Sequence, residues 1–330
     1  MKPQKPTTPL QPMTVDEINV MTARARSLPP GGDQTHVLVG DGEDPWVVSH
    51  DGHFYYCTVD RPKRKILVSR FDDLREMADA PCVEVWPAAL GDVPDYVEIW
   101  SPELQLLDGR WYIYFALYLG DSGQERMYVI EGTSADPQGE YRFKGRLDIE
   151  TDRWAIDGSV LEMPGGEKYF IWSGWDAHIN ESQNIYIAKM ADPWTIVSDR
   201  VLISRPEYDW EKNGYPYINE GPQALTRDGK VFIIYSASGS WTDDYCLGQL
   251  TYLGGDPLDP ASWQKHPRPV FEKTETIFGP GHCSFVKDGR GTDWIIYHAA
   301  RSSGAGWARQ VRAKPFTWNR DGTPNFGHPI

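Results

Sequence analysis

The sequence of 330 residues lacks the features that define several large classes of protein. No run approaches the roughly 18 consecutive apolar residues of a transmembrane helix, and the N-terminus has no apolar segment of the kind found in signal peptides. The four cysteines, Cys57, Cys82, Cys246 and Cys283, form no C-x-x-C pair, which excludes zinc-ribbon and dithiol redox motifs. We therefore expect no association with membranes, and a location either in the cytoplasm or outside the cell after removal of a signal.

The sequence also lacks the motifs of several common enzymes and binding proteins. It contains no G-x-S-x-G nucleophile elbow, no glycine-rich phosphate or dinucleotide motif after a strand, and no histidines at zinc-ligand spacing. Lys and Arg number 33 against 47 Asp and Glu, and the formal net charge is −14. The densest basic cluster, residues 61–65, contains a proline and is typical of an exposed turn. A nucleic-acid partner, which requires basic patches, is therefore not expected, and a neutral substrate fits best.

Aromatic residues, by contrast, are plentiful, since the chain has 14 Trp, 17 Tyr and 11 Phe. Two explanations compete for this excess. Aromatic side chains favour packed β-sheets, and flat rings also stack against the apolar faces of sugars. We expect most of these rings to pack in sheets and a few to bind sugar.

The N-terminal segment differs from the rest of the chain. Residues 1–12 are rich in Pro, Thr and Gln and are expected to form a tail. Thr14 and Glu17 form an S/T-x-x-E capping box, which predicts a short helix from about Val15 to Arg26. We therefore divide the chain into a tail and helix over residues 1–33 and a second unit over residues 34–330.

The second unit contains a repeat. A Gly-containing turn followed by an apolar, aromatic strand occurs five times, beginning at residues 51, 108, 165, 228 and 288. The period of about 60 residues leaves room for two strands joined by a tight hairpin and two more strands. Radially repeated four-stranded sheets form a propeller, so the sequence predicts an all-β, five-bladed β-propeller. The alternative is a β-sandwich with coincidental hairpins.

The first strand of each propeller blade lines the central channel, so residues ahead of the five turns should meet at the hub. One notable polar residue precedes each turn, and the set is Asp44, Glu103, Asp157, Glu220 and His282. Four of them are carboxylic acids. Charged groups among Gly, Pro and apolar residues are costly unless they are paired or solvated, so some of these carboxyls are expected to titrate abnormally.

These motifs resemble those of glycoside hydrolase family 43, and the resemblance covers roughly residues 36–325. Asp44-Pro45, Asp157-Gly158-Ser159 and Glu220-Gly221-Pro222 occur in the family's order. The resemblance implies an inverting glycosidase with Asp44 as general base, Glu220 as general acid and Asp157 as the group that tunes the pKa of the acid. Inversion requires one carboxylate that activates water and one carboxylic acid that protonates the leaving oxygen. We therefore expect an ionised Asp44, and a Glu220 whose pKa is raised by a nearby anion such as Asp157.

Other residues receive roles from the same resemblance. Glu103 lies in Ser-Pro-Glu where the family often has Ala-Pro-Glu, and is expected to hold nearby groups. His282 resembles a histidine that contacts a hub ion, commonly calcium, although pairing with an acid explains it equally well. Arg309 is expected to reach the hub and bind sugar hydroxyls, with a salt bridge to a hub acid as the alternative. Trp100 and Trp175 are candidate sugar platforms, or else core residues.

The sequence motifs look most like those of the arabinofuranosidase branches of the family. The expected activity is therefore that of an exo-acting α-L-arabinofuranosidase on arabinan or arabinose-decorated glycans of the plant cell wall, with no cofactor needed for the chemistry. The alternatives are a β-xylosidase or endo-arabinanase with the same machinery, or a glycan-binding propeller without turnover. The expected partner is a neutral oligosaccharide or polysaccharide.

Overall fold

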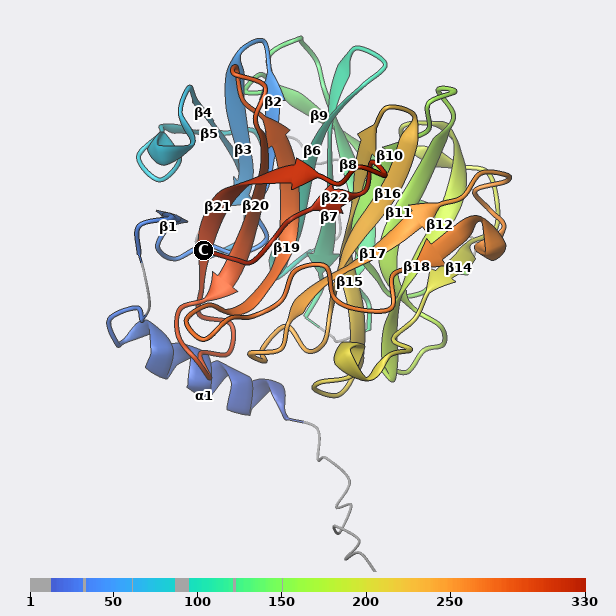
Figure 1. The fold of residues 1–330 in the computed structure, drawn as a ribbon. Coiled ribbons are helices and arrows are strands. Elements are labelled where there is room, and N and C mark those ends of the chain that lie inside the picture. Colours follow the sequence, from blue (N-terminus) through green and yellow to red (C-terminus); the bar gives the residue numbers. More distant parts are fainter. Residues whose placement is uncertain (1–12, 32–33, 61, 87–94, 121–122, 150) are drawn as a thin grey trace, which may run out of the picture.

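The computed structural model describes residues 13–31, 34–60, 62–86, 95–120, 123–149 and 151–330. Its architecture is nearly all β and consists of sheets arranged around an axis (Figure 1). The tail predicted over residues 1–12 lies outside the described residues, as do residues 32–33 next to the predicted boundary. No helix in the described ranges has the length and apolarity needed to cross a bilayer.

Five blades account for the strands, and the five predicted repeats correspond to them. Blade one contains β2 (Trp46–His50), β3 (His53–Val59), β4 (Ile66–Phe71) and β5 (Cys82–Glu84). Blade two contains β6 (Glu98–Leu107), β7 (Arg110–Tyr118), β8 (Arg126–Gly132) and β9 (Tyr141–Arg146). Blade three contains β10 (Ala155–Glu162), β11 (Lys168–Trp175), β12 (Ser182–Asp192) and β14 (Val201–Ser204), with β13 (Thr195–Ile196) beside β12. Blade four contains β15 (Tyr217–Arg227), β16 (Lys230–Ala237), β17 (Cys246–Tyr252) and β18 (Trp263–Lys265).

Blade five closes the ring with a strand from the other end of the described chain. It contains β19 (Phe278–Lys287), β20 (Asp293–Ala300) and β21 (Arg309–Trp318), with the short β22 (Pro324–Asn325) beside β21. Its fourth strand is β1 (Val37–Val39), which pairs antiparallel with β21. The first strands β2, β6, β10, β15 and β19 contact one another in turn and so surround the central axis. The predicted five-bladed β-propeller is therefore confirmed.

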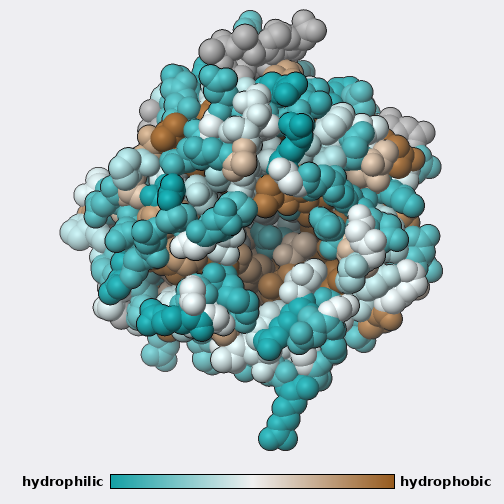
Figure 2. Space-filling view, turned by 90° about the horizontal axis from the view of Figure 1, so that it is seen from above, coloured by the Kyte–Doolittle hydropathy of each residue, from teal (hydrophilic) through white to brown (hydrophobic). Residues whose placement is uncertain are grey.

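Tight turns join the first two strands of the blades, as the Asp-Gly pairs predict. Asp51, Asp108 and Asp228 adopt φ of 49°, 50° and 50°, and the glycine after each also has positive φ, as type I′ hairpins require. These turns lie on one face of the propeller. Seen from this face, the surface is mostly hydrophilic and is hollowed at its centre, with hydrophobic residues inside the hollow (Figure 2).

The predicted N-terminal helix is present as α1 (Val15–Arg26), and Thr14 and Glu17 form the predicted capping box. The helix lies at the end of the propeller away from the hairpin turns (Figure 1). Ile18 packs in one cluster with Ile218 and Trp241. The backbone N–H of Trp307 donates to Thr22 Oγ1 at 2.8 Å. The helix therefore braces segments of blades four and five.

We expect Ile18→Ala to lower the free energy of unfolding by about 2 kcal/mol, because it leaves a cavity between α1 and the propeller. Ile18 is 2% exposed, whereas Val20 on the same helix is 69% exposed. Val20→Ala is therefore the matched control, with an expected change within about 0.5 kcal/mol. Urea unfolding followed by tryptophan fluorescence measures both, and equal effects of the two variants would contradict the packing described for α1.

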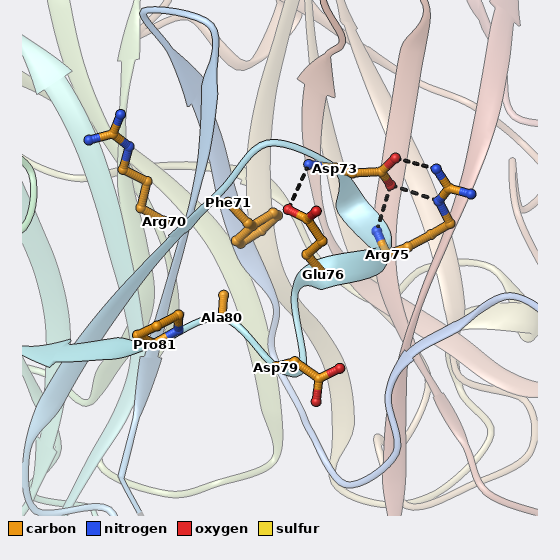
Figure 3. Close-up of a pocket in the computed structure, with 8 residues that line it drawn as sticks. All are labelled: Arg70, Phe71, Asp73, Arg75, Glu76, Asp79, Ala80 and Pro81. Atoms are coloured by element: carbon orange, nitrogen blue, oxygen red, sulfur yellow. Dashed lines mark hydrogen bonds and ion pairs between the residues drawn. The ribbon is translucent and has the colours of Figure 1, made fainter.

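Three 3-10 turns complete the described secondary structure, namely η1 (Leu74–Glu76), η2 (Asp209–Glu211) and η3 (Pro260–Ser262). The first of them borders a pocket between the outer strands of blade one (Figure 3). Arg70, Phe71, Asp73, Glu76 and Pro81 are among its lining residues. The Asp73 carboxylate is paired with Arg75. The pocket contains none of the predicted hub residues.

Candidate active site

The first strand of each blade is kinked at an equivalent place by a residue with left-handed backbone geometry. These residues are Asp44, Ser101, Asp157, Gly221 and His282, with φ between 44° and 55°. In β6, β10, β15 and β19 the pairing register shifts at this residue, as in a β-bulge. For a residue other than glycine this geometry costs of order 1–3 kcal/mol, and such strain is concentrated at functional sites.

The five kink residues form a closed ring of neighbours around the axis. Ser101 Oγ donates to Asp44 Oδ2 at 3.2 Å, and the Ser101 side chain also interacts with Asp157. The backbone N–H of Gly221 donates to Asp157 Oδ2 at 3.0 Å. A Cβ on Gly221 would lie 3.2 Å from His282 Nδ1, which explains why this position is glycine. His282 Nδ1 lies 3.1 Å from Asp44 Oδ1 and closes the ring.

This ring corrects the predicted equivalence of the hub residues. The sequence analysis treated Glu103 and Glu220 as equivalent to Asp44, Asp157 and His282, because each precedes one of the five turns. In blade two the kink residue is Ser101, and Glu103 lies two residues further along β6. In blade four it is Gly221, and Glu220 lies one residue earlier. All five predicted residues nevertheless lie on first strands or just before one, as expected.

Asp44 is held by groups from blades two and five. Besides the contact with His282, its Oδ1 lies 3.3 Å from His298 Nδ1 and 3.4 Å from Arg309 Nη1. The backbone nitrogen of Asp44 also lies 3.1 Å from the same His298 Nδ1. Oδ2 receives the hydrogen bond from Ser101. The side chain is 21% exposed, so a water molecule can reach the carboxylate.

These neighbours favour the ionised form of Asp44. Burial by itself would raise its pKa, but the contacts with His282 and His298 and the Arg309 guanidinium outweigh burial and hold the pKa well below its usual value. Burial lowers the pKa of His282, and lowers that of His298 to about 3. Both imidazoles are therefore neutral near pH 7, and Arg309 supplies the permanent positive charge.

The pKa of Glu220 is shifted in the opposite direction from that of Asp44. Glu220 is 8% exposed, and its Oε1 accepts a hydrogen bond from the Tyr245 hydroxyl at 2.7 Å. Burial raises its pKa to about 7, and the negative charge of Asp44 acts in the same direction, whereas Tyr245 and Arg309 oppose the shift. A carboxyl with this pKa can hold a proton near neutral pH and release it to a substrate. The ionised Asp44 and the raised pKa of Glu220 agree with the sequence-based expectation.

We expected the charge of Asp157 to act on Glu220. Asp157 is 2% exposed, and burial followed by the charges of Glu220 and Asp44 raises its own pKa well above the usual value. The repulsion between Asp157 and Glu220 disfavours a negative charge on either group, and burial is the largest cause of the raised pKa in both. Burial, together with the charges of Asp157 and Asp44, also raises the pKa of Glu103. Asp157 and Glu103 therefore favour the neutral form, because the hub disfavours further negative charge.

Arg309 forms the salt bridge that the sequence left as an alternative. Its Nη1 lies 3.4 Å from Asp44 Oδ1 and 3.7 Å from Glu43 Oε2, and its Nη2 donates to the carbonyl of Ser240 at 3.1 Å. Its role in binding sugar hydroxyls stays a prediction.

Three residues of this site were missed by the sequence analysis: Ser101, Tyr245 and His298. His298 lies among apolar residues of β20, whereas Tyr245 follows two aspartates just before β17. The two rings stack on each other, with centroids 5.5 Å apart. Ser101 was overlooked because Glu103 is the more conspicuous polar residue. A usable pattern exists, since Asp44, Ser101, Asp157 and Gly221 each precede Pro or Gly.

The two candidate sugar platforms are already stacked on other rings. Trp100 is half-buried, stacks on Tyr118 with centroids 5.4 Å apart, and donates through Nε1 to Glu98. Trp175 is buried and stacks on Trp154 at 4.9 Å. One face of each indole is therefore covered by protein. Trp100 is the more accessible of the two, and sugar binding by either stays a prediction.

The hub ion that the family resemblance implies stays a prediction. Within the described ranges, no group of three or more His, Cys, Asp or Glu residues is arranged to hold a metal ion. His282 is directed at Asp44, which is the pairing that the sequence left as an alternative. Calcium also prefers oxygen ligands to imidazole.

A buried ion pair supports the segment that carries Glu220. Glu211 at the end of η2 is fully buried and lies 2.9 Å from Lys265 Nζ. Its Oε1 also accepts hydrogen bonds from Asn219 Nδ2 at 3.0 Å and from the Tyr235 hydroxyl at 2.9 Å. Because Asn219 immediately precedes Glu220, this network fixes the backbone at the acid.

We expect Glu211→Ala to lower the free energy of unfolding by about 3–5 kcal/mol, because it leaves the Lys265 ammonium buried without its partner. Glu162→Ala, at an exposed end of β10, is the control and should change it by less than about 0.5 kcal/mol. Denaturant unfolding at pH 7 measures both variants. An exposed ion pair contributes at most about 1 kcal/mol to stability. A loss in Glu211→Ala below about this value would show that the buried pair is dispensable.

Comparisons with known proteins agree on one family. The family model described as glycosyl hydrolases family 43 matches residues 34–324. The extracellular exo-alpha-(1->5)-L-arabinofuranosidase of Streptomyces avermitilis is 35% identical over 311 residues, which cover 90% of this chain and 63% of that protein. The protein of the same name from Streptomyces chartreusis is 34% identical over 284 residues, covering 83% and 85%. The chain thus spans less than two thirds of the first relative and most of the second.

Solved structures show the same similarity. The crystal structure of an alpha-L-arabinofuranosidase from Lactobacillus brevis matches with a TM-score of 0.81 and 35% identity, covering 90% of this chain and 98% of that one. A thermostable family-43 glycoside hydrolase shares the fold with a TM-score of 0.72 at 22% identity, covering 91% and 98%.

Proposed function

The chain belongs to glycosyl hydrolase family 43, and we propose that it is an exo-acting α-L-arabinofuranosidase that inverts the configuration of the sugar it releases. The observation that carries the chemistry is the opposite shift of two carboxyl pKa values at one hub, with Asp44 low and Glu220 at about 7. Pairs of carboxyls with separated pKa values identify the base and the acid. The choice of sugar and of exo action rests on the relatives from the two Streptomyces species, whose names state both.

Each group of the site has a defined role in this reaction. The ionised Asp44 takes a proton from the water that attacks the anomeric carbon. Protonated Glu220 gives its proton to the leaving oxygen on the other side of the sugar. Arg309 and His282 orient Asp44, and Tyr245 orients Glu220. Because Asp44 belongs to blade one and Glu220 to blade four, the two carboxyls approach the hub from different sides of the channel.

The names of the two Streptomyces relatives include the word extracellular. These names favour a location outside the cell for this protein over one in the cytoplasm. A neutral arabinose-containing oligosaccharide or polysaccharide is the proposed partner.

The first test compares two substrates in two variants. On an arabino-oligosaccharide, we expect Asp44→Asn and Glu220→Gln each to lower kcat/KM by about 10²–10⁴-fold, because each removes a proton transfer. On 4-nitrophenyl α-L-arabinofuranoside, Glu220→Gln should lose much less, because nitrophenolate leaves without protonation, whereas Asp44→Asn should lose as much as before. Steady-state kinetics measure these ratios, and NMR of the first product reports its anomeric configuration.

The exposed Glu162→Gln serves as the control and should retain full activity. Release of xylose from the matching β-D-xyloside, with no cleavage of the arabinofuranoside, would instead identify a β-xylosidase. Internal cleavage of arabinan would identify an endo-arabinanase. Binding of arabinan without turnover would identify a glycan-binding propeller.

A second test concerns the pH dependence. The Tyr245 hydroxyl stabilises ionised Glu220, so its loss in Tyr245→Phe raises the pKa of Glu220 above about 7. A higher pKa keeps the acid protonated to higher pH, so the alkaline limb of kcat/KM should move up by about one pH unit. The phenyl ring keeps the stacking on His298. A shift of the alkaline limb to lower pH would contradict this role of Tyr245.

A further inference from the structure

Helix α1 packs on two loops that lead into the candidate active site. The loop of residues 238–245 connects β16 to β17, and the loop of residues 301–308 connects β20 to β21. Ile18 of the helix belongs to one buried cluster with Trp241 of the first loop. Ala25 belongs to another cluster with two alanines of the second loop. The helix therefore contacts both loops at once.

The close contact between α1 and the second loop depends on a glycine. Gly306 has φ of 60°, and a Cβ at this position would lie 2.8 Å from Thr22 Oγ1 and 3.1 Å from the carbonyl oxygen of Ile18. A larger residue would therefore push the helix and the loop apart. At the distance that glycine allows, Thr22 Oγ1 donates to the carbonyl of Ile18 at 2.8 Å and accepts from the backbone N–H of Trp307 at 2.8 Å.

Trp307 extends this contact to the first loop and to the hub. Its indole Nε1 donates to Ser240 Oγ at 3.1 Å, and the carbonyl of the same serine accepts from Arg309 Nη2 at 3.1 Å. The other end of the guanidinium, Nη1, lies 3.4 Å from Asp44 Oδ1. A continuous series of contacts thus runs from Thr22 on the helix to the Asp44 carboxylate.

The two loops are also tied to each other next to this series. Asp243 Oδ1 accepts from the backbone N–H of Gly304 at 2.8 Å, and Oδ2 accepts from the Ser303 hydroxyl. Because the loops are joined in this way, a displacement of α1 shifts both of them together. It would then move the Ser240 carbonyl, the neutral partner that fixes where the guanidinium lies relative to the hub carboxylates.

We propose that Thr22 and Trp307 are positioning residues through which α1 holds the Arg309 guanidinium beside Asp44. The helix is thus a part of the catalytic unit as well as a support for blades four and five. The consequence for turnover rests on the proposed function, in which Asp44 is the base. The placement of Arg309 by the helix does not rest on it.

The kinetic test uses Thr22→Val, which keeps the shape of the side chain and removes the acceptor for the Trp307 N–H. We expect kcat to fall about tenfold, the effect of roughly one hydrogen bond, on both an arabino-oligosaccharide and 4-nitrophenyl α-L-arabinofuranoside. Both substrates need Asp44, whereas KM should change less than about twofold. Thr22→Ser, which keeps the hydroxyl, should recover most of the activity.

Thr226→Val is the matched control, because Thr226 is exposed on β15 next to the hairpin turn, and its kinetics should equal those of the wild type. A loss confined to the oligosaccharide would show that the helix acts on Glu220 instead, and would overturn the proposal. Equal losses in Thr22→Val and Thr22→Ser would also overturn it, since they would trace the effect to packing alone.

A double-mutant cycle tests whether the helix acts through Arg309. In an Arg309→Met background the guanidinium is absent, so Thr22→Val should cause no further fall in kcat. A further tenfold fall, as in the wild-type background, would mean that the two residues act independently.

Nuclear magnetic resonance reports the placement of Arg309 without turnover and so separates this proposal from the proposed function. In protein labelled with ¹⁵N-arginine, the Arg309 Nε–H signal is identified by its absence in Arg309→Met. We expect this signal to shift in Thr22→Val and to keep its position in Thr22→Ser and Thr226→Val. An unmoved signal in Thr22→Val would overturn the proposal even in an active enzyme. A shifted signal in a protein without glycosidase activity would support it and refute the proposed function.

Discussion

Burial of several carboxyl groups around the guanidinium of Arg309 is the constraint on which the site depends. Ionised carboxylates repel one another where little water can screen them, so only those nearest a positive charge remain ionised. Asp44 is nearest, at 3.4 Å from Arg309, and keeps its charge. Glu220, Asp157 and Glu103 respond by retaining protons to higher pH. The division between one base and several acids therefore follows from the positions of Arg309 and of the two histidines that contact Asp44.

The propeller creates this constraint by repeating one backbone feature in every blade. Each first strand is kinked by a left-handed residue, and the kink turns its side chain or amide toward the neighbouring blade. The resulting ring of contacts joins blades that are far apart in the sequence, as between Asp44 and His282. Closure of blade five by β1 holds the ends of the ring together, since β21 carries Arg309 and β1 pairs with it only a few residues before Asp44.

Much of this arrangement could be predicted from the sequence, because it depends on local patterns. The five turns predicted the blades, the Asp-Pro, Asp-Gly-Ser and Glu-Gly-Pro motifs predicted three hub acids, and the capping box predicted α1. The rest depends on contacts across the ring. Val37–Val39 has no repeat partner in sequence, so its place in blade five was not predictable. His298 lies in an apolar strand that resembles core, and Tyr245 lies in the segment just before β17. The protonation of Asp157 depends on which groups surround it.

The acid that this chemistry requires also sets a limit on stability. The pKa of Glu220 is about 7 in the folded chain and 4.5 for an ordinary glutamate, so protonation favours the folded state. This contribution is complete below pH 4.5 and is lost as the pH rises to about 7, above which the buried carboxylate costs about 3 kcal/mol. The raised pKa values of Asp157 and Glu103 act in the same direction. The lowered pKa of Asp44 acts in the opposite direction: it stabilises the fold at pH values above the usual pKa of an aspartate, and this contribution is lost as the pH falls toward the lowered value. A carboxyl can hold its proton near neutral pH only if the fold disfavours its ionised form, so this loss of stability is inherent in a general acid.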